Sequence, residues 1–159
     1  MLKCALTILD MIYPLESIYL KDVTEYIAQE KSVTGLFNVP HGHSYTRRPF
    51  EYVTAEQYIR CLSQLSYVLI GLMIEDRLSD FDFTSYQTFE RLMVEQKMWF
   101  RRSDLRYLKN TAKDTDFELT LTLKSVSTKR VFSVCIIQIG GVIAGELEFV
   151  APFNVGDTS

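Results

Sequence analysis

Residues 54–74 read TAEQYIRCLSQLSYVLIGLMI and decide the fold expected for this chain of 159 residues. Thr54 is a good helix N-cap, and Gln57 follows three residues later, at the spacing of a capping box. Glu56 lies in the first turn, where a negative charge favours the helix dipole. Beyond this turn, apolar side chains occupy nearly all faces, which is typical of a helix surrounded by protein. The stretch therefore predicts a long helix at the centre of the molecule.

The same stretch does not predict a membrane span. Crossing a bilayer takes about 20 mainly apolar residues, whereas the apolar part, residues 58–74, numbers seventeen and includes Arg60, Ser63 and Gln64. The net charge of −3 and the isoelectric point near 5.4 give no overall drive toward nucleic acid or anionic lipid. We therefore expect no membrane span and no nucleic-acid partner.

Strand-like segments lie on both sides of the predicted helix. Residues 116–125, DFELTLTLKS, alternate apolar and polar side chains, which is typical of a half-buried antiparallel strand. The pair Gly140-Gly141 predicts a tight turn between two further strands. The expected strands cover residues 23–28, 33–39, 92–101, 116–125, 129–139 and 142–150. This order predicts an α+β hot-dog fold, a curved antiparallel sheet wrapped around a long central helix, with a generic sheet and one flanking helix as the alternative.

One domain, residues 1–159, accounts for this length, with a core over about residues 20–151, a packed N-terminal segment and a short C-terminal tail. The three cysteines, Cys4, Cys61 and Cys135, lack the spacing of zinc ligands. Cys61 and Cys135 lie in apolar runs, which indicates buried thiols in a reducing compartment. We therefore expect a cytoplasmic protein without a metal or another cofactor.

Three stretches, TAEQYIRCLSQLSYVLIGLM, FERLMVEQKMWFRRSDLRYL and VCIIQIGGVIAGELEFV, resemble the FcoT-like family of hot-dog fatty-acyl thioesterases. The matching positions are Cys61, Gln64, Leu65 and Tyr67, then Trp99-Phe100-Arg101-Arg102, and finally Gly140, Gly141, Ala144, Gly145 and Glu146. The likeness covers roughly residues 45–150. It implies action on long acyl chains held as thioesters to CoA or acyl carrier protein.

The chain departs from the family pattern just before the helix. The family carries a His and an Asn near the positions of Tyr52 and Thr54, and an Asn where this chain has Ser63. If those residues carry the family's chemistry, this protein catalyses a different reaction or none. Close relatives add glycine to an enoyl thioester. Hot-dog dehydratases use a His before a Pro-containing loop, which His43 and Pro49 loosely resemble.

The start of the predicted helix carries the candidate chemistry. Free N–H groups of residues 54–58 can stabilise negative charge on a thioester oxygen, with Thr54 at the first of these positions. Glu56 can accept a proton and Gln57 can position water, although a first-turn charge is the structural reading of Glu56. His43 is a second candidate base, or a polar loop residue. His41 and His43 have no adjacent carboxylate, so we expect no metal there.

Several polar side chains are candidates for substrate binding. Tyr45 and Tyr52 can bond the thioester carbonyl or line the acyl slot, and each has packing as its structural reading. Gln64 lies within an apolar helix, so it either bonds the backbone or faces the acyl chain. Tyr67 is a candidate through the family resemblance.

Two basic pairs are candidates for contact with CoA phosphates or an acidic carrier protein. These pairs are Arg47-Arg48 and Arg101-Arg102. Guanidinium groups match phosphate oxygens with two parallel hydrogen bonds. The structural reading is a solvated surface charge.

The sequence thus favours an acyl-thioester-acting hot-dog enzyme, first of all one that hydrolyses fatty-acyl-CoA or acyl-carrier-protein thioesters. The alternatives are a 3-hydroxyacyl or enoyl thioester dehydratase, a glycine-adding lyase, and a non-catalytic acyl-binding protein. The expected partners are acyl-CoA or acyl carrier protein and a second copy of the chain. We expect at least a homodimer, because unpaired strand edges are exposed to aggregation, and the family resemblance implies a higher assembly such as a hexamer.

Overall fold

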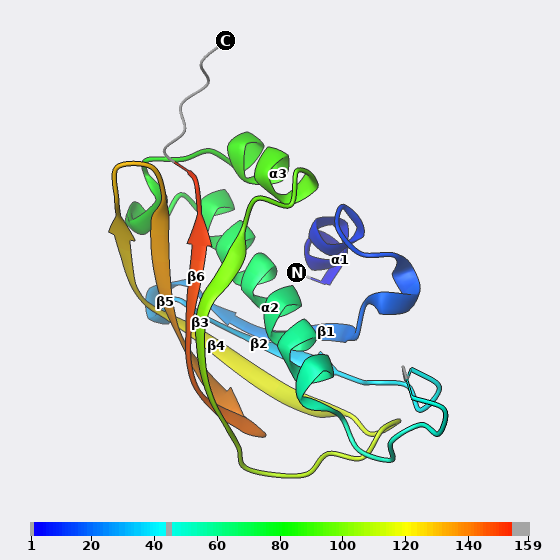
Figure 1. Cartoon of the computed structure of the whole chain (residues 1–159). Coiled ribbons are helices and arrows are strands. Elements are labelled where there is room, and N and C mark those ends of the chain that lie inside the picture. Colours follow the sequence, from blue (N-terminus) through cyan, green and yellow to red (C-terminus); the bar gives the residue numbers. More distant parts are fainter. Residues whose placement is uncertain (1, 44–45, 154–159) are drawn as a thin grey trace.

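The computed structural model describes residues 2–43 and 46–153, with a curved antiparallel sheet around one long helix, α2 (Ala55–Glu75) (Figure 1). The strand order is β1-β2-β4-β5-β6-β3. The strands are β1 (Leu20–Ile27), β2 (Ser32–Phe37), β3 (Trp99–Tyr107), β4 (Phe117–Thr128), β5 (Ser133–Gly141) and β6 (Ile143–Ala151). The other helices are α1 (Leu2–Asp10) and α3 (Tyr86–Val94), with 3-10 turns at Leu15–Ser17, Ala28–Glu30 and Ser79–Phe81. This arrangement confirms the predicted α+β hot-dog fold.

The long helix starts as the capping residues predict. Thr54 Oγ1 accepts a hydrogen bond from the Gln57 amide at 3.4 Å, and Gln57 Oε1 accepts one from the Thr54 amide at 3.0 Å. Leu62, Leu65 and Leu69 are fully buried along the helix. Within the described part of the chain, no helix is both long enough and apolar enough to cross a membrane.

The sheet alone does not enclose α2, contrary to the expectation that it would cover most sides of the helix. The sheet covers one side, and α1 and α3 lie on the other (Figure 1). Gly71 makes this close packing possible, since a Cβ atom there would lie 2.7 Å from Ile8 and 3.0 Å from Phe89. The apolar surface of α2 is therefore divided between the sheet and two short helices, and the N-terminal segment packs as predicted.

The later strands follow the sequence pattern closely. Phe117, Leu119 and Leu121 of β4 are buried and alternate with more exposed polar residues, as predicted. Strands β5 and β6 form the expected hairpin, with Ile139 opposite Gly145. Gly141 has a φ of 112°, and a Cβ there would lie 2.4 Å from the Glu118 carbonyl oxygen. The turn therefore requires glycine because a side chain would collide with β4.

The strand predicted over residues 92–101 is wrong in its first half. Residues 86–94 form α3, and β3 begins only at Trp99. Ser85 Oγ caps α3 by accepting a hydrogen bond from the Thr88 amide at 3.1 Å. Phe89, Leu92 and Met93 are buried at helical spacing. The apolar run belongs to one face of a short helix, which a period-two interpretation misses.

Candidate functional site

The amino end of α2 presents two backbone donors that have no acceptor within the described part of the chain. The capping box occupies the amides of Thr54 and Gln57, and the Tyr58 amide donates to Thr54 O at 3.0 Å. Among the described residues, no acceptor is bonded to the amides of Ala55 and Glu56. These N–H groups lie at the positive end of the helix dipole and can stabilise an oxyanion.

His43 lies against this helix end. Its backbone oxygen accepts a hydrogen bond from Gln57 Nε2 at 2.7 Å and another from Lys113 Nζ at 3.0 Å. Its imidazole Nδ1 is 3.3 Å from the hydroxyl of Tyr19, which is 3% exposed. The prediction that His43 and the start of the helix belong to one site is consistent with this geometry, whereas its role as a base stays a prediction.

Glu56 and Arg60 extend the same polar group. Arg60 Nη1 donates to the Tyr19 hydroxyl at 3.3 Å, and Arg60 Nη2 is 3.4 Å from Glu56 Oε1. The guanidinium also lies 5.5 Å from the centre of the Tyr19 ring. We call Tyr19, His43, Glu56 and Arg60 the amino-end cluster. Burial raises the pKa of Tyr19, and the Arg60 charge opposes that rise, so the phenol is protonated at neutral pH.

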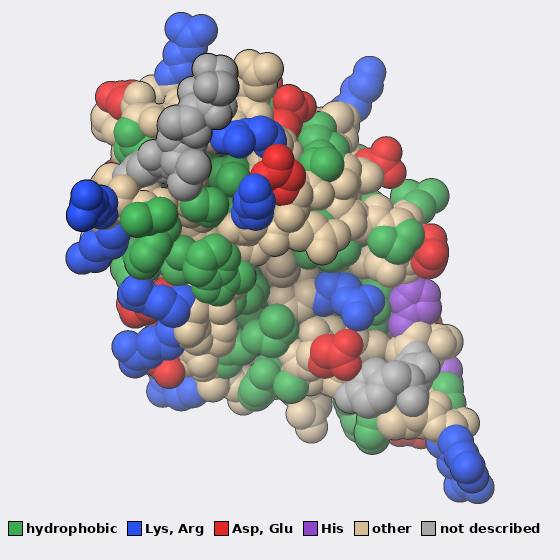
Figure 2. Space-filling view, turned by 45° about the horizontal axis from the view of Figure 1, so that its top comes forward, with side chains coloured by type: hydrophobic (Ala, Val, Ile, Leu, Met, Phe, Trp, Pro, Cys, Tyr) green, Lys and Arg blue, Asp and Glu red, His purple; other side chains and the backbone are tan. Residues whose placement is uncertain are grey.

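The amino-end cluster is open to solvent on one side. His43 is half-buried, and the side chains of Arg60 and Glu56 are 34% and 54% exposed. Figure 2 shows histidine at the surface beside a basic side chain. A substrate in water can therefore reach a cluster that holds a carboxylate, an imidazole, a phenol and a guanidinium.

Sequence reasoning missed three members of this site. Tyr19 precedes β1, and Lys113 lies in the connection between β3 and β4, so neither has a local motif. Lys113 is 6% exposed and is held by its amide, which donates to Glu51 O at 2.9 Å. Arg60 had a detectable signal, because it follows Glu56 by four residues and such pairs meet on a helix surface.

Two residues that were predicted to belong to the site, Gln64 and Gln57, use their side-chain amides in hydrogen bonds within the protein. Gln64 is fully buried; its Oε1 accepts from the amides of Tyr19 at 3.0 Å and Leu20 at 3.3 Å, and its Nε2 donates to Ser17 O at 2.8 Å. These three hydrogen bonds favour the structural reading of Gln64. They also hold the backbone of Tyr19 in position. Gln57 likewise uses its amide group in the cap and on His43, so the structure favours a supporting role for it.

Of the remaining residues that were predicted to bind substrate, Tyr52 is exposed and Tyr67 is buried. Tyr52 is 52% exposed and pairs with Ala112 in an isolated bridge. Tyr67 is buried and packs edge-on against Phe149, so it does not join the amino-end cluster. Tyr45 lies outside the described residues.

The two arginine pairs differ in position. Arg47 and Arg48 are exposed in the loop that leads to α2. Arg101 and Arg102 lie at the start of β3, which follows α3 at the other end of the molecule (Figure 1). Arg101 pairs with Glu148 at 2.7 Å, and Arg102 pairs with Asp104. Only Arg47 and Arg48 thus lie on the chain segment of the amino-end cluster, while phosphate binding by either pair stays a prediction.

The buried cysteines do not suit nucleophilic catalysis. Cys61 and Cys135 are fully buried, as predicted. Burial raises the pKa of Cys135 to about 12 and raises that of Cys61 further, so both remain thiols at neutral pH. Among the described residues, no three His, Cys, Asp or Glu side chains are grouped to hold a metal ion.

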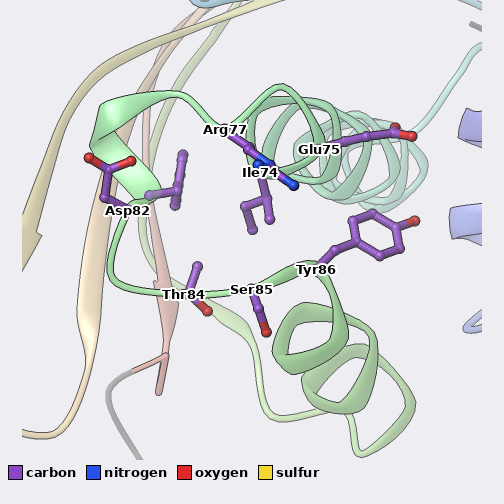
Figure 3. Close-up of a pocket in the computed structure, with 8 residues that line it drawn as sticks. Ile74, Glu75, Arg77, Asp82, Thr84, Ser85 and Tyr86 are labelled. Carbon is purple, nitrogen blue, oxygen red and sulfur yellow. The ribbon is translucent and has the colours of Figure 1, made fainter.

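A cavity of about 550 Å³ lies at the carboxyl end of α2. Figure 3 shows Glu75 and Asp82 on opposite walls, with the Arg77 side chain between them and Tyr86 at the rim. Because α2 has 21 residues, a rise of about 1.5 Å each separates the helix ends by about 30 Å. Opposed charges surround this cavity, so its chemistry does not converge on one ligand class.

Solved structures support the fold. A chain of the dehydratase heterocomplex ApeI:P from Xenorhabdus doucetiae superimposes with a TM-score of 0.58 at 10% identity, over 91% of this chain and 90% of that one. This chain has the hot-dog fold. No family model and no curated protein matches the sequence, so the resemblance to the FcoT-like family stays a prediction.

Two further structures are more distant. A phenylacetic acid degradation-related protein from Ralstonia eutropha JMP134 gives a TM-score of 0.49 at 9% identity, over 82% of this chain and 83% of that one. A hypothetical thioesterase with coenzyme A from Streptococcus pneumoniae TIGR4 gives 0.42 at 14% identity, over 81% and 83%.

Proposed function

We propose that the protein hydrolyses fatty-acyl thioesters at the amino end of α2. The observation that supports this most directly is the pair of unpaired amides of Ala55 and Glu56, which adjoin the Glu56 carboxylate and the amino-end cluster. Acyl transfer from a thioester develops negative charge on the carbonyl oxygen, and preorganised N–H groups stabilise that charge. We further propose that the acyl chain lies along the apolar residues that follow this helix start.

The proposed reaction needs one base and one oxyanion site. The Glu56 carboxylate takes a proton from water, and the resulting hydroxide attacks the carbonyl carbon. The Ala55 and Glu56 amides donate hydrogen bonds to the oxyanion. As the carbonyl re-forms, the carbon–sulfur bond breaks, and the thiolate takes the proton from Glu56 to leave as the free thiol, which restores the Glu56 carboxylate. His43 is the second candidate for the base, and its variant separates the two.

The group that carries the acyl chain, CoA or acyl carrier protein, is proposed to bind the basic loop before α2. Arg47 and Arg48 are exposed there and can contact CoA phosphates or the acidic surface of an acyl carrier protein. Such contacts weaken as salt increases, since exposed charges are screened.

A second copy of the chain is proposed to pair along β3, which is an edge strand. On β3, Arg102 and Asp104 lie opposite Glu148 and Glu146 of β6, so both face the same side of the sheet. A two-fold axis at Ser103 would place Arg102 of one copy opposite Asp104 of the other. Cross-strand pairs of opposite charge stabilise such a ladder. Sedimentation analysis of Arg102→Asp, which places like charges opposite each other, tests this arrangement.

A panel of acyl-CoA and acyl-carrier-protein thioesters of graded chain length, assayed for free thiol, tests the activity. Thiol release that saturates with long chains supports hydrolysis. Consumption of enoyl thioesters with water or glycine, without thiol release, would replace it by addition chemistry. Tight acyl binding without any turnover would indicate a non-catalytic acyl-binding protein.

A further inference from the structure

Lys113 is buried, and the described residues offer it no negative partner. It is 6% exposed, and among the described residues no carboxylate oxygen lies within ion-pair distance of its Nζ atom. A buried ammonium is costly unless it is bonded. Its one hydrogen bond to the described residues goes to the backbone oxygen of His43, at 3.0 Å. Its presence there therefore needs a reason beyond packing.

The His43 carbonyl is held from two sides. Gln57 Nε2 donates to the same oxygen at 2.7 Å, from the first turn of α2. A carbonyl oxygen has two lone pairs, so both are used. The backbone of His43 is thus tied at once to the helix start and to the connection between β3 and β4.

That connection is itself fixed on both sides of Lys113. The Lys113 amide donates to Glu51 O at 2.9 Å, and the Asp114 amide donates to Val39 O at 2.9 Å. The Asp114 carboxylate accepts a hydrogen bond from the His41 amide at 3.1 Å. This segment therefore binds the loop that carries His43 on both sides of the histidine: at Val39 and His41 before it, and at Glu51 after it.

The imidazole of His43 contacts Tyr19 next to this backbone anchor. Its Nδ1 atom is 3.3 Å from the Tyr19 hydroxyl, and the two rings lie 5.5 Å apart. Gln64 holds the Tyr19 backbone, so one ring of this pair is already fixed by α2. Lys113 supplies the corresponding fixed point for the other ring.

We infer that Lys113 is a positioning residue, which orients the His43 imidazole toward Tyr19 at the amino end of α2. This role deepens the proposed function, and the catalytic part of its test rests on that function. The positioning itself can be measured without any substrate, so the two can fail separately.

The experiment compares Lys113→Met, Lys113→Gln and Lys113→Arg with the unchanged protein. Met removes the donor and the charge, Gln keeps a donor, and Arg keeps both. The chain has two histidines, so an imidazole ¹H–¹⁵N spectrum reports His43 with His41 as an internal control. We expect Lys113→Met to move the His43 ring signals far more than those of His41. We expect Lys113→Arg to restore them.

Where His43 is the base of the thioester reaction, Lys113→Met should lower kcat by about 10- to 100-fold, because small misplacements of catalytic groups have effects of this size. KM should change little, since Lys113 is not proposed to contact the acyl chain. Unmoved His43 signals in Lys113→Met would overturn the positioning role, whether or not hydrolysis is found. If Lys113→Met does not fold, Lys113→Gln decides, because its side chain is shorter and its amide donor reaches less far toward the His43 oxygen. Moved His43 signals then support the role, and unmoved signals refute it.

Discussion

The two ends of α2 differ in how their polar side chains are arranged. At the amino end, three side chains meet at His43: the Tyr19 hydroxyl contacts its imidazole, and the Gln57 amide and the Lys113 ammonium bind its backbone oxygen. The carboxyl end has a cavity of about 550 Å³, yet its lining combines the acidic Glu75 and Asp82 with the basic Arg77. The difference teaches that volume alone does not mark a reactive site. Convergence of groups with one chemical purpose is the better guide.

The largest expected contrast between the ends is catalytic. Glu56→Gln or His43→Gln, whichever residue is the base, should lower kcat/KM for long acyl thioesters by about 10²- to 10⁴-fold, because general-base catalysis contributes this much. Arg77→Ala and Asp82→Asn at the cavity should leave kcat/KM unchanged. Thiol release measures all four variants, with circular dichroism as the control for folding. Equal losses at both ends would remove the proposed site from the amino end.

Between the ends, Gln64 and Ser66 are both fully buried on α2, but within the described ranges only the Gln64 side chain of the two has hydrogen-bond partners. Gln64→Ala should destabilise the fold by about 3–5 kcal/mol, because three backbone groups lose their hydrogen bonds and a cavity forms. Ser66→Ala should change the free energy of unfolding little, since its hydroxyl has no partner among the described residues. Urea denaturation measures both. A small effect of Gln64→Ala would mean that water replaces its amide.

Much of this fold could be predicted from local pattern. The capping box at Thr54 and the run of apolar residues define α2, and strict alternation defines β4. The nine residues of α3 could not be predicted in the same way. Nine residues make little more than two helical turns, so the spacing of Phe89, Leu92 and Met93 does not by itself decide between helix and strand. Burial of these side chains in the core decides it, and that contact is absent from the local sequence.

The candidate site likewise contains residues that the local sequence indicates and residues that only the folded chain brings together. Glu56, Gln57 and His43 could be proposed from the sequence because they flank the helix start. Tyr19 lies 24 residues before His43, and Lys113 lies 70 residues after it. Spacings of this length carry no periodic signal, so only the folded chain brings these two residues to the histidine.

A smaller difference between the two ends of α2 concerns the residues that cap the helix. Thr54→Ala removes the side-chain acceptor of the Gln57 amide and should destabilise the protein by about 1 kcal/mol. Thr54→Ser keeps the hydroxyl and should preserve most of the stability. Thermal unfolding of both variants measures the difference. Equal losses would show that the Thr54 methyl group, rather than its oxygen, stabilises the amino end.

The carboxyl end should respond in the opposite direction. Arg77 has a φ of 53°, a left-handed conformation that residues with a Cβ atom rarely adopt, and the Leu78 amide closes the helix by donating to Met73 O at 3.0 Å. Glycine is the residue preferred at such a position. Arg77→Gly should therefore stabilise the protein by up to about 1 kcal/mol, whereas Arg77→Ala keeps the strain and should gain nothing. If Arg77→Gly lowers the melting temperature instead, the arginine side chain must make a contact at this end that outweighs its strained backbone, and the carboxyl end would then hold a functional group of its own.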